Sequence, residues 1–388
     1  MTVFLSRQRR YDVGEIRSRL EEALTELGES PSGRRAVIKP NLVNQFGRSS
    51  GTTTHPFVVE AIHGALRDRG FTDIAIADGP SINRPVDEVF SNSGMTELAR
   101  RLGVELVDLN QAPRRLVAWP YGEIGLPELI LDADYYVSVP KMKTHVRSGV
   151  SLSLKNQQGI CDYQEKRNNH KRGVDEPLGE LGKVLRPHLI VLDGVEGMEG
   201  NGPTHGKRTS PGVFAAGTDP VEFDTVIAQV MGFRPEEVPM IAYATTQPCR
   251  PDVRGLSIEE VVVPFKRPSQ GECQRMLGLR VWSNVRSCNG CDLHVTIAKE
   301  SLRSNPRVIL RYGPRLLPRI LFGRIDVLKG EQSNVPEDHG TLVFLGDCTA
   351  EPAAKHSGLF VPGCPPDPQA ILDALVGSGA RWRSDDKN

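Results

Sequence analysis

The sequence of 388 residues lacks net charge, because 48 lysines and arginines are matched by 48 aspartates and glutamates. A protein that binds nucleic acid over its whole surface carries an excess of basic residues, so this class is excluded, although a local basic patch is not. Apolar runs are short, and none approaches the roughly 18 uncharged residues of a membrane-spanning helix. Charges also interrupt residues 1–12, where a secretory signal needs an apolar segment. We therefore expect no membrane span and a cytoplasmic location.

Cysteine is scarce as well, because seven cysteines in a chain of this length are too few for a disulfide scaffold. In a reducing cytoplasm, cysteines that cluster in the sequence are metal ligands or catalysts instead. Two nucleotide-binding motifs are also missing. No G-x-G-x-x-G follows a strand in the needed register, and no G-x4-G-K-[ST] motif is present. The sequence thus does not support a dinucleotide-binding or P-loop protein.

Glycine and proline are abundant, since 38 glycines and 29 prolines make up about 17% of the chain. The usual share is roughly 12%, and the excess favours a loop-rich α/β protein over a helical bundle. Residues 34–42 and 73–78 are expected to form buried strands, and residues 56–68 between them a helix. A further helix is expected to begin with Asp219 as its N-cap and Pro220 in its first position.

This alternation of strands and helices predicts an α/β fold with two domains. The N-terminal domain, residues 1–270, is expected to hold a mostly parallel sheet with helices on both faces. The character of the sequence changes near Lys266, and five of the seven cysteines follow this point, four of them as a group. We expect a second, smaller α/β domain at residues 271–388.

Polar clusters follow most of the expected strands and include lysines, which are not turn formers. The carboxyl ends of parallel strands meet at one edge of a sheet, so we expect these side chains to line a single cleft. Lysines in a cleft bind carboxylate or phosphate groups, and a desolvated lysine also serves as an acid or base. The predicted substrate-binding residues are Lys39, Asn41, Lys141, Lys143, Asn156, Asp193 and Asn201. The predicted catalytic residues are Lys155, His145 and Glu196.

Other interpretations of these residues stay open. The polar clusters are also typical of ordinary turns. Asp193, Glu196 and Glu199 form a carboxylate-rich loop that could hold a divalent cation, as in a hydrolase or ligase. Three cysteines lie before the C-terminal group: Cys161, Cys249 and Cys273. The first is a candidate catalytic thiol, and the other two follow no partner pattern.

Four cysteines form a group in the C-terminal domain. Cys288 and Cys291 are separated by two residues, a spacing with which one turn presents both sulfurs to one metal or cluster. Cys348 and Cys364 each follow a short apolar strand and a glycine. Four thiolates without a histidine fit an iron–sulfur cluster or a structural zinc ion. The fifteen residues between the second two cysteines argue against most zinc ribbons, so zinc is the alternative occupant.

The order of these motifs resembles a known family. CNGC, then a strand ending in GDC, then VPGCPP is similar to the electron-transfer small subunit of nickel-iron hydrogenases and the corresponding subunit of respiratory complex I. The resemblance covers roughly residues 278–380 and implies a flavodoxin-like α/β core with one 4Fe-4S cluster. It assigns the ligand positions to Cys288, Cys291, Cys348 and Cys364. The complex I subunits depart from this pattern, because their first two cysteines are adjacent.

The larger, N-terminal part of the chain resembles the family catalogued as domain of unknown function 362. The resemblance extends from residue 37 to about residue 263 and is carried by VIKPNLV (37–43), SVPKMKTH (138–145) and AGTDPVEFD (216–224). The family's activity is largely unassigned, so the resemblance indicates family membership but says little about the reaction. Its members often occur with iron–sulfur modules, which agrees with the interpretation of the four cysteines.

A basic stretch runs from residue 299 to residue 329 and contains eight lysines and arginines but only two acidic residues. Arginine recurs at every fourth position from Arg303 to Arg319, and three prolines forbid one continuous regular helix over the stretch. Such a surface would steer an acidic electron carrier. Only two aromatic residues are interleaved, which disfavours nucleic acid. A solvated or subunit-facing surface is the alternative.

These features lead to three hypotheses about function. The first is an iron–sulfur protein, a reductase that passes low-potential electrons from one 4Fe-4S cluster to a small anionic substrate in the N-terminal cleft. The second is a non-enzymatic electron-transfer, assembly or carrier subunit. The third is a divalent-metal-dependent hydrolase or ligase.

Overall fold

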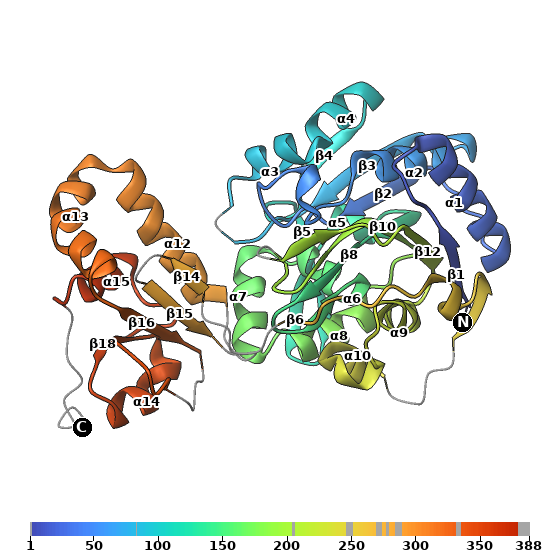
Figure 1. The fold of residues 1–388 in the computed structure, drawn as a ribbon. Coiled ribbons are helices and arrows are strands. Elements are labelled where there is room, and N and C mark those ends of the chain that lie inside the picture. The colour runs from blue at the N-terminus through green and yellow to red at the C-terminus, as the bar shows by residue number, and fades with distance from the viewer. Residues whose placement is uncertain are drawn as a thin grey trace. The chain divides into compact units, whose positions relative to one another are not determined.

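The computed structural model describes residues 2–82, 84–203, 206–245, 251–268, 274–276, 279–283, 289–330 and 335–378. The chain divides into two compact units, Met1–Pro268 and Ser269–Asn388 (Figure 1). We call them unit 1 and unit 2 and describe each by itself. Within the described ranges, no helix is both long enough and apolar enough to cross a membrane.

Unit 1 is built on an 11-stranded sheet. Its strands are β1 (Thr2–Arg7), β2 (Arg35–Pro40), β3 (Asp73–Asp78), β4 (Glu105–Asp108), β7 (Tyr135–Val139), β8 (Lys141–His145), β9 (Gly149–Ser151), β10 (Leu189–Glu199), β11 (Lys207–Thr209), β12 (Val213–Gly217) and β13 (Asp252–Gly255). The main path runs β13-β1-β12-β10-β7-β2-β3-β4, and the strands from β10 to β4 pair in parallel. β12 is antiparallel to both of its neighbours. A separate hairpin joins β5 (Arg114–Trp119) and β6 (Gly122–Pro127).

Helices connect these strands. They are α1 (Val13–Leu27), α2 (Pro56–Asp68), α3 (Val86–Ser93), α4 (Met95–Leu102), α5 (Glu128–Leu131), α6 (Ser153–Asn156), α7 (Tyr163–Arg172), α8 (Asp175–Val184), α9 (Pro220–Val230), α10 (Pro239–Ala244) and α11 (Ile258–Val261). Short 3-10 turns lie at η1 (Arg48–Ser50), η2 (Gln157–Ile160) and η3 (Pro235–Glu237). The predicted start of α9 is confirmed, because Asp219 Oδ1 accepts hydrogen bonds from the first turn and Pro220 is the first helical residue.

The alternation of side chains along β2 shows that helices cover both faces of the sheet. Ala36 and Ile38 belong to one apolar core, together with residues of α1, α2 and α4. Val37, between them, belongs to a second core with residues of α8 and α9. Successive residues of a strand point to opposite faces, so a strand buried on both sides is apolar throughout. The prediction of a mostly parallel α/β sheet with helices on both faces is confirmed.

Unit 2 is a smaller α/β unit with a 5-stranded sheet in the order β14-β15-β16-β17-β18. Its elements are β14 (Gln274–Met276), β15 (Leu279–Ser283), α12 (Asn289–Ser304), α13 (Pro306–Leu321), β16 (Ile325–Lys329), β17 (Thr341–Leu345), η4 (Asp347–Thr349), α14 (Ala350–Lys355), β18 (Leu359–Val361) and α15 (Pro368–Leu375). The strands from β15 to β18 are parallel, and β14 is an antiparallel edge. These four parallel strands follow chain order, whereas flavodoxin has the order 2-1-3-4-5.

The prolines of the basic stretch act differently from one another. Pro306 separates α12 from α13, as a helix-breaking residue is expected to do. The prediction that no single continuous helix spans the stretch is confirmed, although Pro314 and Pro318 lie inside α13. Both are on the exposed side of the helix, where the carbonyl groups that lose an amide partner can be solvated by water.

Candidate functional site

Lys39 lies near the end of β2 and is wholly buried. Its Nζ is 2.7 Å from Asp78 Oδ1, at the end of β3, and 3.0 Å from Asn156 Oδ1. Gly159 packs directly on this pair: a Cβ there would lie 2.6 Å from Lys39 Nζ and would overlap Asp78 Oδ1. Burial lowers the pKa of Lys39, and the Asp78 carboxylate opposes this shift. The two side chains therefore form a tightly enclosed ion pair.

Lys141 begins β8 and forms a second buried ion pair, with Asp193 of β10. Its Nζ is 2.9 Å from Asp193 Oδ2 and donates a hydrogen bond of 2.7 Å to the Tyr11 hydroxyl. That hydroxyl donates to Asp193 Oδ1 at 2.9 Å, and the backbone N–H of His55 donates to Oδ2 at 2.8 Å. The rings of Tyr11 and His55 stack with their centroids 3.8 Å apart. Both carboxylate oxygens of Asp193 are thus engaged by the protein itself.

Lys143, also in β8, is buried without a carboxylate partner. Its Nζ donates to Asn41 Oδ1 and, at 2.7 Å, to the carbonyl oxygen of Thr52. The Asn41 side chain in turn donates to Asn156 Oδ1 at 3.1 Å. Burial and the neighbouring lysines lower the pKa of Lys143 well below its ordinary value. Neutral oxygen acceptors suit such an amine, because they do not require it to carry a full charge.

The structure therefore brings six of the seven predicted substrate-binding residues into the interior of unit 1. Lys39, Asn41, Lys143 and Asn156 are joined by hydrogen bonds, and Lys141 pairs with Asp193. The three amino groups are satisfied by oxygens of the protein, so a substrate that contacted them would have to displace those partners. The seventh predicted residue, Asn201, lies in the turn after β10.

A different arrangement surrounds Lys155 in α6. Lys155 is half-buried, and within the described part of the chain no hydrogen bond or ion pair engages its amine. Near it, Arg147 Nη1 and His170 Nδ1 are buried and have no hydrogen-bond partner among the described residues. Further atoms of this kind belong to η2 and α7: Gln158 Oε1 and Nε2, and Asn169 Oδ1. Native interiors contain few such atoms, so a group of them marks a place where water or a ligand supplies the missing bonds.

Charge interactions join Arg147, Lys155, His170 and Asp175, which we call the Lys155 cluster. Burial lowers the pKa of Lys155 to about 8. The charge of Asp175 opposes this shift, and the charge of Arg147 adds to it. Burial and the positive charge of Lys155 lower the pKa of His170 to about 3. Burial raises the pKa of Asp175, and a hydrogen bond with Ser148, followed by the charges of Lys155 and Arg147, opposes that shift. A lysine that exchanges its proton near neutral pH beside an arginine suits both anion binding and proton transfer.

His145, at the end of β8, borders the cluster. Its Nδ1 accepts hydrogen bonds from the backbone N–H groups of Arg147 and Ser148, at 3.2 and 3.1 Å. This assigns the proton of the neutral ring to Nε2. Burial, followed by the charges of Lys155 and Lys143, holds the pKa of His145 well below its ordinary value. The ring is therefore a neutral hydrogen-bond donor at physiological pH.

Backbone strain lies next to the cluster. Val174 is fully buried and has φ = 41°, a left-handed conformation that a β-branched side chain rarely adopts. Asp175 follows it as the first residue of α8. Strained backbone persists only where the surrounding structure enforces it, and such positions concentrate at functional sites. The strained residue thus directly precedes a member of the Lys155 cluster.

The other predicted catalytic residue, Glu196, is engaged by a partner outside the Lys155 cluster. Its carboxylate forms an ion pair with Arg208, and Glu199 accepts a hydrogen bond of 3.0 Å from the backbone N–H of Lys266. The two carboxylates and Asp193 thus have separate partners in the fold. Across the described residues of both units, no three His, Cys, Asp or Glu side chains are grouped closely enough to hold a metal ion.

Cys161, the candidate catalytic thiol, is fully buried beside α7. The amide of Asn169 lies 3.6 Å from its sulfur. Burial raises the pKa of the Cys161 thiol to about 12, which disfavours the thiolate that nucleophilic catalysis needs. The geometry therefore suits a structural cysteine. Cys249 and Cys273 lie outside the described residues.

In unit 2, three loops bring cysteines to one edge of the sheet. Cys291 is buried in the first turn of α12, and Cys348 lies in η4, directly after β17. A Cβ on Gly346 would lie 3.3 Å from Cys291 Sγ and 3.6 Å from Cys348 Sγ, so the two sulfurs converge on one point. Gly346 also has φ = 88°, which only glycine adopts readily. A larger residue would both strain this turn and push into the sulfurs.

Cys364 lies after β18, in a loop that is tied to the other two. The backbone N–H of Gly363 donates to Asp347 Oδ1 at 2.7 Å, next to Cys348. His294 Nδ1, one turn after Cys291, lies 2.7 Å from the carbonyl oxygen of Pro366. The side chain of Cys364 is exposed. Cys288, the fourth predicted ligand, lies outside the described residues.

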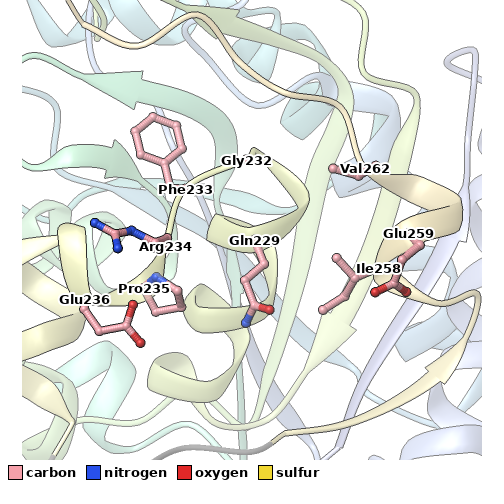
Figure 2. A pocket seen from close by; sticks show the side chains of 9 residues that line it. All are labelled: Gln229, Gly232, Phe233, Arg234, Pro235, Glu236, Ile258, Glu259 and Val262. Carbon is pink, nitrogen blue, oxygen red and sulfur yellow. The ribbon is translucent and has the colours of Figure 1, made fainter.

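One surface hollow of about 430 Å³ lies in unit 1, beyond the C-terminal end of α9 (Figure 2). Gln229, Phe233 and Arg234 line one side of it, and Ile258 and Val262 of the α11 region line the other. None of the predicted site residues contributes to it. The arginine at its rim is already paired with a neighbouring glutamate. The unsatisfied polar atoms around Lys155 are therefore the stronger candidate for a binding site.

The fold and these sites define an α/β protein with a polar interior at its strand ends and a separate cysteine-bearing unit. Residues 36–229 match the family described as "Domain of unknown function (DUF362)", and the chain belongs to that family. A thylakoid-associated protein of Synechocystis sp. is 29% identical over 253 residues, which are 62% of this chain and 78% of that protein. Lactate racemase apoprotein from Thermoanaerobacterium thermosaccharolyticum has a TM-score of 0.38 and 15% identity. That match covers 58% of this chain and 56% of the racemase.

Proposed function

We propose that the protein is an iron–sulfur oxidoreductase that reduces a small anionic substrate. Cys288, Cys291, Cys348 and Cys364 are the proposed ligands of one 4Fe-4S cluster in unit 2. When bound, such a cluster takes up and releases one electron at a time. The observation that carries the proposal is the convergence of Cys291 Sγ and Cys348 Sγ on the space kept open by Gly346. Zinc is the alternative occupant of the same thiolates.

The bonds between the cysteine loops support a single site. The Cys364 loop is held to the Cys348 loop through Asp347, and to α12 through His294. Parallel strands end at the same edge of a sheet, so loops after β17 and β18 are neighbours by construction. A four-thiolate ligand set needs this placement, because the ligands come from three separate segments of the chain.

The proposed substrate site in unit 1 is the Lys155 cluster. Arg147 and Lys155 supply positive charge, and only Asp175 supplies a carboxylate, so a small anion balances the charge of the group. The unpartnered donor of Arg147 and the proton on His145 Nε2 suit the oxygens of a carboxylate or phosphate. Lys155, with a pKa near 8, is the proposed proton donor to the reduced product.

The electron donor and the cellular setting are part of the proposal. An acidic carrier protein is the proposed source of low-potential electrons, since the Arg303–Arg319 stretch provides a basic surface. The proposed location is the reducing cytoplasm, where thiolate ligands stay reduced. The relative from Synechocystis is named for an association with thylakoids, so a membrane-proximal setting is compatible with the proposal.

Iron content tests the metal site. After anaerobic purification and iron reconstitution, we expect a brown protein with about four irons per chain. Cys348→Ser and Cys291→Ser should each lose most of this iron. Cys161→Ser is the matched control, because Cys161 is a buried cysteine of unit 1, and it should keep the full iron content. A colourless protein with one zinc per chain after the same treatment would contradict the proposal.

The second hypothesis, an electron carrier without an active site, is favoured by the basic stretch in unit 2. A redox titration with and without added anions distinguishes a carrier from a reductase. A carrier shows a reversible couple that anions do not affect. A reductase loses anion-dependent turnover when Lys155 is replaced by Met and keeps its iron. The third hypothesis, a divalent-metal hydrolase or ligase, gains no support, because Asp193, Glu196 and Glu199 are already engaged by other groups.

A further inference from the structure

Helix α13 in unit 2 exposes a continuous apolar surface. Four large side chains on and just after it are mostly accessible: Leu310 at 77%, Leu317 at 57%, Leu321 at 53% and Phe322 at 89%. Single exposed apolar residues are common on proteins and need no explanation. Three of them, Leu310, Leu317 and Leu321, are spaced by seven and four residues and so share one side of the helix, and apolar patches of this kind mark interaction sites.

The patch occupies one of three distinct faces of the helix. With 3.6 residues per turn, positions three, four and seven apart lie on one side. Tyr312 and Leu316 face the core of unit 2 and are buried. Leu310, Leu317 and Leu321, spaced by seven and four, lie on a second face that has no partner in the described part of the chain.

The third face is basic. Arg307, Arg311 and Arg315 recur at every fourth position and are exposed, so they form a row alongside the apolar face. α13 contains neither aspartate nor glutamate, and Arg319 is the basic residue of its last turn. This composition sets α13 apart from the chain as a whole, in which acidic and basic residues balance.

Docking of the acidic carrier proposed above accounts for the arginines and leaves the leucines unexplained, so on α13 a bilayer takes the place of that carrier. A helix that lies in the plane of a bilayer accounts for both, because its apolar face enters the boundary of the acyl chains while its arginines meet anionic headgroups. At 16 residues and with its row of arginines, α13 is suited to the surface of a membrane and not to its interior. We propose that α13, together with Phe322, binds this protein to the surface of an anionic lipid bilayer.

Sedimentation of the full-length protein with lipid vesicles tests the proposal independently of the iron–sulfur function. Vesicles of equal parts phosphatidylcholine and phosphatidylglycerol should bind the protein, and vesicles of phosphatidylcholine should bind it much more weakly. Raising the ionic strength should release it, because exposed charges are screened by salt. The variant L310S/L317S should weaken binding at least about tenfold, which corresponds to about 1.4 kcal/mol, because two apolar side chains no longer enter the acyl-chain boundary. The variant R307Q/R311Q should weaken binding to the anionic vesicles and reduce its dependence on salt.

Leu116→Ser is the matched control, because Leu116 is an exposed leucine, at 65%, that belongs to β5 of unit 1 and not to α13. It should bind vesicles like the unmodified protein. The replaced side chains of α13 are exposed, so circular dichroism and the unfolding midpoint should stay unchanged in all variants. Failure of the unmodified protein to bind anionic vesicles would overturn the proposal. So would a leucine-dependent dimer that forms without lipid, which would assign the apolar face to a second copy of the chain.

Discussion

Two groups of buried lysines in unit 1 differ in how their charge is balanced. Lys39 and Lys141 each contact an aspartate at 2.7 and 2.9 Å, and both pairs are almost completely enclosed. No carboxylate among the described residues lies within ion-pair distance of the Lys155 amine, and Arg147 and His170, whose charges act on it, carry atoms without hydrogen-bond partners. In the first arrangement each lysine has its counter-charge in contact, whereas in the second it does not. This contrast separates lysines that hold the fold together from a lysine available for chemistry, although all three follow or adjoin strand ends in the sequence.

The energetic consequences of the two arrangements also differ. A buried charge that loses its only counter-charge destabilises a protein strongly, since neither solvent nor a neighbour compensates it. A buried charge that never had a counter-charge already reduces the stability of the fold, and its removal relieves that cost. Substitutions in the two groups should therefore have opposite effects on the free energy of unfolding.

The largest effect is expected for Asp193→Ala. This change leaves the Lys141 amine buried and removes the acceptor of the Tyr11 hydroxyl and the His55 amide. The free energy of unfolding should fall by about 3–5 kcal/mol, as measured by chemical denaturation. Asp132→Ala is the control: the Arg115–Asp132 pair has the same charges but is about half exposed, so the change should be under about 1 kcal/mol. Equal effects of the two substitutions would show that Lys141 is not a structural lysine.

A smaller effect is expected for Gly159→Ala, which tests how tightly the other pair is enclosed. The added methyl group would contact Lys39 Nζ and overlap Asp78 Oδ1, so the ion pair or the η2 turn has to shift. Overpacking of this kind destabilises a protein by about 1–3 kcal/mol. Gly64→Ala is the control, because Gly64 lies within α2 and faces only the flexible end of an arginine side chain. It should leave the midpoint of denaturation unchanged or raise it. A neutral Gly159→Ala would indicate a looser site at Lys39.

Much of the fold follows from local patterns in the sequence. The strand at residues 73–78 and the helix at residues 56–68 have the predicted bounds, because each is apolar with the period of its element and is closed by glycine or proline. The N-cap at Asp219 was predictable for the same reason, since a capping side chain acts on the turn that directly follows it. The continuation of α13 through Pro314 and Pro318 was not predictable, because the tolerance of a helix for proline depends on which side of the helix faces solvent.

The candidate site was less accessible to sequence analysis. The sequence identified the buried lysines but not their partners, because Asp78 and Asp193 come from separate strands whose pairing is set by the sheet. Arg147, His170 and Asp175 were missed, since they lie in a turn and in polar helices that carry no motif. In the sequence, α7 is a charged stretch typical of a solvated surface, and only the fold reveals that His170 has an unpartnered nitrogen. The Lys155 cluster is therefore recognised by the missing hydrogen bonds in the fold, and not by any spacing of residues in the sequence.

The smallest expected effect is that of Lys155→Met, and its dependence on pH is diagnostic. The pKa of Lys155 is lowered from about 10.5 to about 8 in the folded protein, so between these values the unfolded chain binds more protons than the folded one. The stability of the unmodified protein should therefore rise with pH in this window relative to the variant. Below about pH 8 the variant should be the more stable, by on the order of 1 kcal/mol, because solvent partly screens this half-buried charge. The difference should shrink as the pH approaches 10.5. If Lys155 were ion-paired in the manner of Lys39, denaturation curves would instead show a less stable variant at neutral pH.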